Sequence, residues 1–148
     1  SSTITGSNNH IFGAISGTNL TGDDNVSIGI NSSENASSCS NNVAVGRYAF
    51  RYFTTSSNDN VAIGYGSMMG SSGNSVDASN NTCIGKYSGQ ILTTGYNNVI
   101  IGANAGDQIT SGSRNIIIGY IVTVQIPRNT DNRNHFRGVP ALCCRRIV

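Results

Sequence analysis

The sequence contains no tryptophan, only 11% of its 148 residues are charged, and its formal net charge is +2. Such polarity alone would be typical of disorder, but so low a net charge argues against a self-repelling random coil. No run of apolar residues is long enough to cross a bilayer, so we expect no membrane insertion. The chain begins at Ser1 rather than at Met, and we interpret it as a piece of a longer protein.

The four cysteines and two histidines do not have the spacing of a metal site. Cys39, Cys83, Cys143 and Cys144 include no Cys-x-x-Cys pair, and neither histidine lies near a cysteine at the spacing of a zinc site. Calcium-binding repeats of the Gly-Gly-x-Gly-x-Asp type are also absent. We therefore expect no metal and no cofactor, and we interpret Cys83 as a free thiol, consistent with assembly in a reducing compartment.

Asparagine, serine and glycine make up 58 of the 148 residues, and one five-residue phrase recurs throughout. The phrase is Asn, two mostly aliphatic residues around a variable one, and Gly, as in Asn60-Val-Ala-Ile-Gly64. Its copies run from Asn9 to Gly13, Asn25 to Gly29, Asn42 to Gly46, Asn60 to Gly64, Asn81 to Gly85, Asn98 to Gly102 and Asn115 to Gly119. The closing glycines are 16 to 21 residues apart, a period that is typical of one turn of a β-solenoid.

Each copy predicts a short strand with an inner and an outer face. We assign Val61 and Ile63 to the inside and Ala62 to the outside, because alternate residues of a strand point to opposite faces. The closing Gly suits a turn with positive φ. A looser phrase follows it, as at 88–98 and 105–115, and predicts a second short strand that ends at a Thr-Gly or Ser-Gly corner. The longest interval, around 70–79, predicts a loop that bulges from one corner.

The sequence thus predicts an all-β, repetitive β-solenoid or β-helix, similar to a β-roll, of about seven coils over residues 1–120. Residues 121–148 are expected to form a terminal strand and a basic tail that together carry five of the nine Lys and Arg residues. The strand is predicted over 120–126, so its first residue, Tyr120, belongs to the last coil. We favour a capping or linking tail. The alternative is a basic segment that meets phosphate, an acidic glycan or a partner subunit. No interleaved aromatics support nucleic-acid binding.

Each predicted coil has only three or four aliphatic residues to bury, which is little for a coil of about 17 residues. Hydrogen bonds between coils and stacked Asn side chains supply part of the stability. Burial against other copies would supply the rest, so we expect a homotrimeric fibre or a filament.

The phrase Asn-Val-Ala-Ile-Gly, followed by a small residue, resembles the head repeats of trimeric autotransporter adhesins of the YadA type. The fuller rhythm of Ala-Gly, Leu-Thr-Thr-Gly and Asn-Asn-Val-Ile-Ile-Gly is similar to repeats in bacteriophage or viral tail fibres and tailspikes. The resemblance covers roughly residues 6–120. It implies a trimeric β-solenoid on a virion surface or an extracellular cell surface, which displays binding sites for a host glycan or receptor. The longer coils and the Thr-Thr-Gly corner depart from the adhesin heads and favour the fibre.

Four tyrosines follow repeat glycines by one or two residues and are candidate glycan-stacking residues: Tyr48, Tyr65, Tyr87 and Tyr120. Stacking of coils would bring them near one another along one edge, where sugar rings could pack on them. The alternative is that these rings cover the edge of the ladder or pack between chains with their hydroxyls in water.

Catalysis is not expected. Some phage spikes cleave polysaccharide with paired carboxylates, but most of Asp23, Asp24, Asp59, Asp77 and Asp107 occupy corner positions where Asp is favoured for its own backbone hydrogen bonds. The function favoured by the sequence is a structural fibre or adhesin segment that displays a receptor-binding surface for host attachment. Two alternatives remain: a purely structural self-assembling filament, and a monomeric solenoid that binds a crystalline surface such as ice, which would need a flat Thr array.

Overall fold

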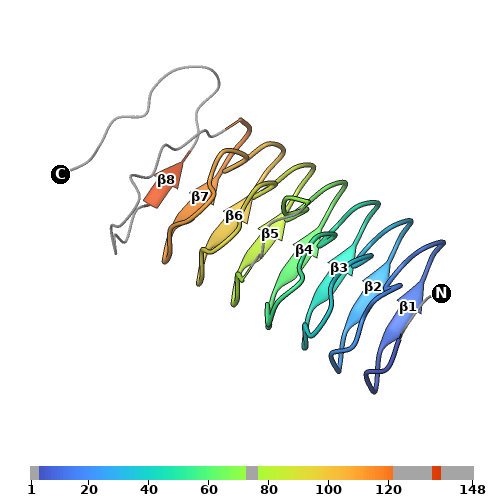
Figure 1. Cartoon of the computed structure of the whole chain (residues 1–148). Helices are drawn as coiled ribbons and strands as arrows, with labels where there is room; N and C mark the ends of the chain where they lie inside the picture. Colours follow the sequence, from blue (N-terminus) through green and yellow to red (C-terminus); the bar gives the residue numbers. More distant parts are fainter. Residues whose placement is uncertain (1–3, 73–76, 122–134, 138–148) are drawn as a thin grey trace.

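The computed structural model of the chain describes residues 4–72 and 77–121, together with the backbone of 135–137. It contains eight three-residue strands that are stacked along a rod (Figure 1). They are β1 (His10–Phe12), β2 (Val26–Ile28), β3 (Val43–Val45), β4 (Val61–Ile63), β5 (Thr82–Ile84), β6 (Val99–Ile101), β7 (Ile116–Ile118) and β8 (His135–Arg137).

The strands form one parallel sheet in the order of the chain, and each copy of the phrase pairs with the next without a slip. Ala44 pairs with Ala62, for example, and Ala62 pairs with Cys83. The described residues contain no helix. The all-β solenoid predicted from the repeat is therefore confirmed, with one coil for each interval between β1 and β7.

The repeat asparagines form a buried ladder at the start of the strands. The Oδ1 atom of Asn60 accepts hydrogen bonds from the backbone nitrogen and the Nδ2 of Asn81, at 3.0 and 3.2 Å. Its own Nδ2 donates to Asn42 Oδ1, to the Asn58 carbonyl and to the Ala78 carbonyl, at 2.8 to 3.0 Å. A carboxylate could not donate, and a hydroxyl has only one hydrogen to donate, whereas the amide has two donor hydrogens and a separate acceptor oxygen, which explains why Asn recurs at this position.

The repeat glycines turn the chain at the end of each strand. Gly64 has a φ of 128°, and a Cβ placed there would lie 2.6 Å from the carbonyl oxygen of Gly85 in the next coil. The same close approach recurs from Gly13 to Gly102. Both the left-handed backbone and the contact between coils exclude a side chain, so the turn that was predicted for this position is confirmed.

The orientation that we predicted for the strands is wrong, because the middle residue of each strand points inward. Ala62 is fully buried, whereas Val61 is only partly buried and Ile63 is 37% exposed. The interior is narrow at this point: Ser67, on the facing wall, donates a hydrogen bond to the carbonyl of Cys83, the middle residue of β5, at 2.8 Å. Small residues therefore fill the middle position in β2 to β5, and the larger Val and Ile residues lie outside.

The predicted second strand is also wrong, since the stretch after each Gly is a series of turns. Two of its positions take positive φ in each coil, as at Tyr48 and Phe50, or at Tyr87 and Gly89. Such residues interrupt an extended chain. The coils still pair through backbone hydrogen bonds in this stretch, for example from Phe50 to Ser67 and from Met68 to Ser88.

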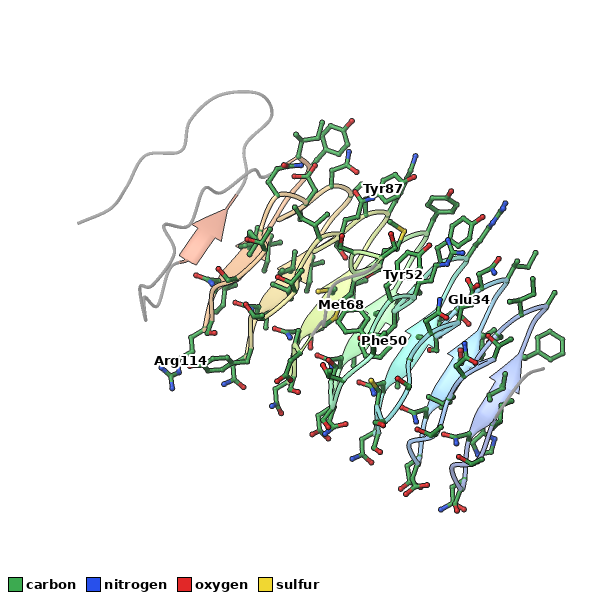
Figure 2. The ribbon with its side chains drawn as sticks, in the orientation of Figure 1. Glu34, Phe50, Tyr52, Met68, Tyr87 and Arg114 are labelled. Atoms are coloured by element: carbon green, nitrogen blue, oxygen red, sulfur yellow. The ribbon has the colours of Figure 1, made fainter. Side chains whose placement is uncertain are left out.

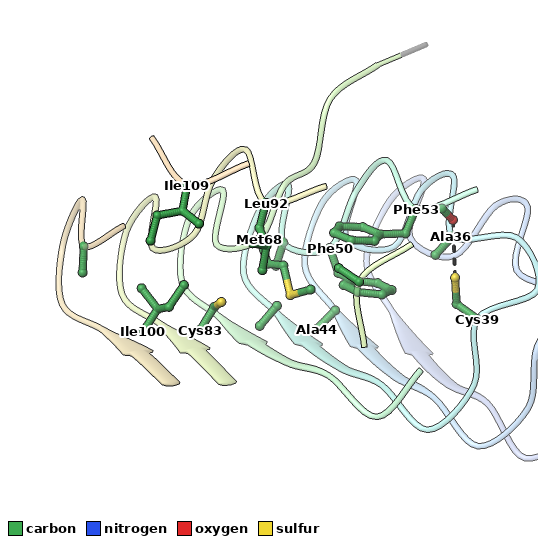
Figure 3. Close-up of a cluster of buried hydrophobic side chains, with 14 of the residues drawn as sticks. Ala36, Cys39, Ala44, Phe50, Phe53, Met68, Cys83, Leu92, Ile100 and Ile109 are labelled. Atoms are coloured by element: carbon green, nitrogen blue, oxygen red, sulfur yellow. Dashed lines mark hydrogen bonds between the residues drawn. The ribbon is translucent and has the colours of Figure 1, made fainter. Parts of the chain in front are cut away.

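The interior changes in character along the rod. Near β1 and β2 it is polar, with Ser16, Ser27 and Ser32 hydrogen-bonded to one another at 2.7 to 2.9 Å. In the middle the rings of Phe50 and Phe53 stack with their centroids 4.0 Å apart. The later coils are filled by larger apolar residues (Figure 3), namely Met68, Leu92, Ile100, Ile109 and Ile117.

The sheet continues beyond residue 120. β8 pairs with β7 in the register of the earlier strands, from Ile116 with His135 to Ile118 with Arg137. It belongs to an eighth copy of the phrase, Asn134-His-Phe-Arg-Gly138, which our sequence analysis included in the tail. The strand expected over 120–126 does not begin at its predicted start, because Tyr120 and Ile121 form a bend with a φ of 46° at Ile121. The rest of that segment lies outside the described residues. Of the long loop, 73–76 also lie outside them, while Gly70 and Asp77 on either side bond to the next coil.

Candidate binding surface

The most distinctive surface of the rod is the corner that follows the repeat glycines, which we call the trailing edge. Its first and second corner positions are the two residues directly after each Gly. The nitrogen of the second position donates to the carbonyl of the first position in the preceding coil, as from Tyr87 to Tyr65 at 2.9 Å. Because this bond repeats, the two corner positions form rows along the rod, with a gap in the side chains of the second row at Gly66.

Three of the four predicted tyrosines meet on this edge. The ring of Tyr65 lies between those of Tyr48 and Tyr87, with centroid distances of 5.7 and 5.2 Å and interplanar angles of 81° and 84°. Gly66 makes room for this arrangement, since a Cβ there would lie 2.7 Å from two ring carbons of Tyr87. A hydrogen bond with Tyr65 raises the pKa of the Tyr87 phenol above its ordinary value.

The fourth predicted residue, Tyr120, does not join them. It is 66% exposed and occupies a first corner position. In the coil before it this position is Ala103, and in the coil before that it is Lys86, so an alanine separates Tyr120 from the aromatic and basic residues. No ring contact is recorded for Tyr120 within the described part of the chain. The predicted row of tyrosines is therefore confirmed for Tyr48, Tyr65 and Tyr87 and is interrupted before Tyr120.

Three cations surround the tyrosines, and sequence reasoning missed them. The Arg47 guanidinium lies 4.6 Å from the centroid of Tyr48 and donates a hydrogen bond to its hydroxyl at 2.7 Å. Lys86 lies 5.3 Å from the centroid of Tyr87. The guanidinium of Arg51 lies between Tyr48 and Tyr52, at 4.7 and 4.6 Å from the ring centroids. Contacts of this kind hold the cations against the ring faces.

Arg51 differs from the other two cations because it is paired with a carboxylate. Its Nε bonds to Glu34 Oε2 at 2.5 Å, and the same oxygen accepts a hydrogen bond from Asn31 at 2.9 Å. Partial burial lowers the pKa of Arg51, but the hydrogen bond to Glu34, the charge of Glu34 and the neighbouring tyrosines Tyr52 and Tyr48 together raise it above the ordinary value. No carboxylate partner is recorded for Arg47 or Lys86 among the residues that the structure describes.

Charge is unequally divided between the two edges of the rod. Three of the four Lys and Arg residues whose side chains the structure describes lie at or beside the trailing edge, where Glu34 pairs with Arg51 and Asp107 occupies the position equivalent to Arg51. Asp23, Asp24 and Asp59 lie on the corner that precedes the repeat asparagines, the leading edge. Figure 2 shows Glu34, Tyr52 and Tyr87 along one edge and Arg114 at the other. Among the Lys and Arg residues whose side chains are described, Arg114 is thus the one outside the trailing edge.

The outer face of the sheet forms a second continuous surface. It consists of the first and third residues of β1 to β7, and twelve of these fourteen positions are apolar, the exceptions being His10 and Thr82. The exposed fractions of Ile28, Ile63 and Ile118 are 42%, 37% and 43%. Seven strands at about 4.8 Å make this strip roughly 30 Å long. None of its positions carries Lys, Arg, Asp or Glu.

Two of the carboxylates that were weighed as catalytic pairs accept structural hydrogen bonds, whereas the buried Oδ1 of Asp107 has no partner among the described residues. Asp23 accepts a hydrogen bond from the backbone of Ser7 at 2.7 Å, and Asp24 accepts one from Asn8 at 3.0 Å. Asp24 and Asp59 also take positive φ at the residue before a repeat Asn. Asp23, Asp24 and Asp59 therefore have structural roles in the corners of the coils, where short polar side chains favour local hydrogen bonds and turns.

The two described cysteines are free and buried. Burial raises the pKa of the Cys83 thiol to about 12 and that of Cys39 to about 11. Both are protonated near neutral pH and are therefore unreactive, which agrees with the interpretation of Cys83 as a free thiol. Cys143 and Cys144 lie outside the described residues.

Within the described ranges, no three His, Cys, Asp or Glu side chains gather where they could hold a metal ion, and no helix is long and apolar enough to cross a membrane. Comparisons of the chain with family models, curated proteins and solved structures give no match. The function is therefore inferred from the surfaces of the rod, the trailing edge and the outer sheet face.

Proposed function

We propose that this chain is a stiff fibre segment that associates with two further copies through the outer sheet face and displays its trailing edge to a cell-surface glycan or receptor. The observation that carries the proposal is the unbroken register from β1 to β7. Because the register is kept, equivalent side chains of successive coils line up into two long surfaces. The outer sheet face is apolar, and the trailing edge is aromatic and basic. Such a rod suits host attachment at a virion surface or an extracellular cell surface.

The outer sheet face supports association with other copies. Apolar strips of this length on a protein surface usually mark an interaction site. A second copy offers rows of Val and Ile at the same spacing, and the absence of charge on this face leaves no group to be buried without a partner. The threefold arrangement follows the resemblance of the repeats to trimeric fibres and adhesins.

Light scattering coupled to size exclusion tests the association. We expect a trimer for the unmodified chain and a monomer for the Ile63→Lys/Ile101→Lys variant, which places charges in the strip. Ile30→Lys is the matched control, because Ile30 is 48% exposed but lies at a corner position off the sheet face. It should remain trimeric. A monomeric unmodified chain, or a trimer that survives the double substitution with intact circular dichroism, would overturn the proposed interface.

The two alternatives differ from this proposal in what they require of the surfaces. A purely structural filament needs the outer sheet face but no ligand on the trailing edge, so the saccharide-binding experiment described below separates it from an attachment fibre. An ice-binding solenoid needs rows of Thr on a flat face, and Thr82 is the only Thr among the fourteen outer positions of β1 to β7.

A further inference from the structure

The trailing edge has a charge pattern that narrows the ligand beyond a glycan in general. Arg47, Tyr65 and Lys86 occupy the first corner position of three successive coils. Because neighbouring strands lie about 4.8 Å apart, the backbone positions of the two cations are roughly 10 Å apart along the rod, with that of the tyrosine between them. Both cations are exposed, and Glu34 is already engaged by Arg51.

From this pattern we infer that the trailing edge binds an anionic polysaccharide that carries a carboxylate or sulfate at intervals of about two sugar residues. The inference rests on the proposed function and names the class of its ligand. One sugar ring would pack its apolar face on Tyr65, and the acidic groups on either side would reach Arg47 and Lys86. Guanidinium and ammonium groups form their strongest hydrogen bonds with such anions.

The same pattern argues against a nucleic acid. A nucleic-acid strand carries a charge on every nucleotide, and the proteins that bind it spread many cations along its path. Single-stranded bases also stack on successive exposed aromatic faces. Here the rings of Tyr48 and Tyr87 stand nearly perpendicular to that of Tyr65 and flank it. The edge therefore presents one tyrosine that is 39% exposed, flanked by two nearly perpendicular rings, between two separate positive charges.

Binding of a labelled hyaluronate fragment, which has one carboxylate for every two sugars, tests this inference. Carboxyl-reduced hyaluronate is the matched ligand, because it keeps the backbone and loses the charge. Fluorescence anisotropy should show binding of the acidic form only, with an affinity that falls as salt is added. The Arg47→Gln/Lys86→Gln variant should weaken binding by about tenfold or more, while Arg114→Gln on the leading edge should have no effect.

Each of the other outcomes would assign a different ligand or role to the trailing edge. Equal binding of both forms, abolished by Tyr65→Ala, would overturn the requirement for charge but leave glycan recognition intact. Preferential binding of a single-stranded DNA oligonucleotide would overturn the sugar. Loss of the trimer in Arg47→Gln/Lys86→Gln would assign these cations to contacts between copies and overturn the inference. Failure to bind any saccharide, with a trimer still formed, would overturn both the inference and the display function while leaving the fibre.

Discussion

At the scale of single residues, Asn81 shows how one side chain serves three coils. Its Nδ2 donates to Asn60 Oδ1, to the Ser79 carbonyl and to the Gly95 carbonyl, while its Oδ1 accepts two hydrogen bonds from Asn98. The side chain is buried. Water cannot reach its polar atoms, so these hydrogen bonds within the protein are the ones that satisfy them. The same pattern ends at Asn115, whose Oδ1 has no partner among the described residues.

We expect Asn81→Asp to destabilise the fold by about 3 to 5 kcal/mol at pH 7, because it buries a carboxylate against carbonyl oxygens. The introduced group should have a pKa above its ordinary value in the folded state. Its penalty should therefore be largest above that pKa and shrink as the pH falls toward 4. Urea unfolding at a fixed protein concentration, repeated at several pH values, measures both effects.

The neighbouring residue supplies the control. Asn80 is exposed and has a φ of 59°, and Asp occupies the equivalent position at Asp24 and Asp59. Asn80→Asp should thus change stability by less than about 0.5 kcal/mol. Equal costs at positions 80 and 81 would show that the ladder does not carry the stability that its geometry indicates.

At the scale of the coil, the two glycines of one corner have different roles. Gly64 touches the backbone of the next coil, whereas Gly66 faces the ring of Tyr87. A backbone contact cannot move aside, but a ring can rotate. The other coils agree with this distinction: the position of Gly64 is always Gly, while the position of Gly66 is Asn31, Tyr48, Tyr87 or Asn104 in four of them.

Gly64→Ala should therefore cost about 3 kcal/mol or more, because a strained φ is added to the clash between coils. Gly66→Ala should cost only about 1 to 2 kcal/mol, the penalty of a left-handed backbone with a side chain. Urea unfolding of the two variants measures the difference. If Gly66→Ala proved as costly as Gly64→Ala, the contact between the coil backbones would not be what restricts the repeat glycines.

The coil also shows which features could be predicted from the sequence. The period gave the solenoid, and the repeat Asn and Gly mark the two ends of every strand. Alternation revealed two faces but not which one was inside, because Ala62 and its neighbours Val61 and Ile63 are all apolar. Only the narrow interior decides that choice. The turns after each Gly were misread as a strand because left-handed Tyr48 and Phe50 have no sequence signal.

The candidate site was partly predictable for a related reason. Tyr48, Tyr65 and Tyr87 follow repeat glycines at a fixed offset, so the period alone places them together. The charged groups beside them were missed for two reasons. A cation occupies the first corner position in only two coils, at Arg47 and Lys86. The ion pair between Arg51 and Glu34 joins two neighbouring coils and does not recur elsewhere among the described residues. Contacts made once in the rod do not appear as a periodic pattern.

At the scale of the whole molecule, the stability of the rod should vary along its length. Each coil contacts only its neighbours, so local stability depends on the interior of that coil and of the two beside it. The serine-lined coils near β1 and β2 bury little apolar area, whereas Ile100, Ile109 and Ile117 fill the coils near β6 and β7. Apolar burial is the main source of stability, so the rod should open first at its β1 end.

Amide hydrogen exchange can test this order directly. Amides of 26–33 should exchange about tenfold faster than those of 99–106, since they open without unfolding the whole rod. The Ser16→Ala/Ser27→Ala/Ser32→Ala variant should slow exchange at 26–33, because the three hydroxyls bond to one another and removing them together leaves no buried hydroxyl without a partner. Ala already occupies the equivalent positions at Ala44 and Ala49, so the substitutions fit the coil. Uniform exchange along the rod, unaltered in this variant, would mean that the coils open together and that the polar interior is not the weak end.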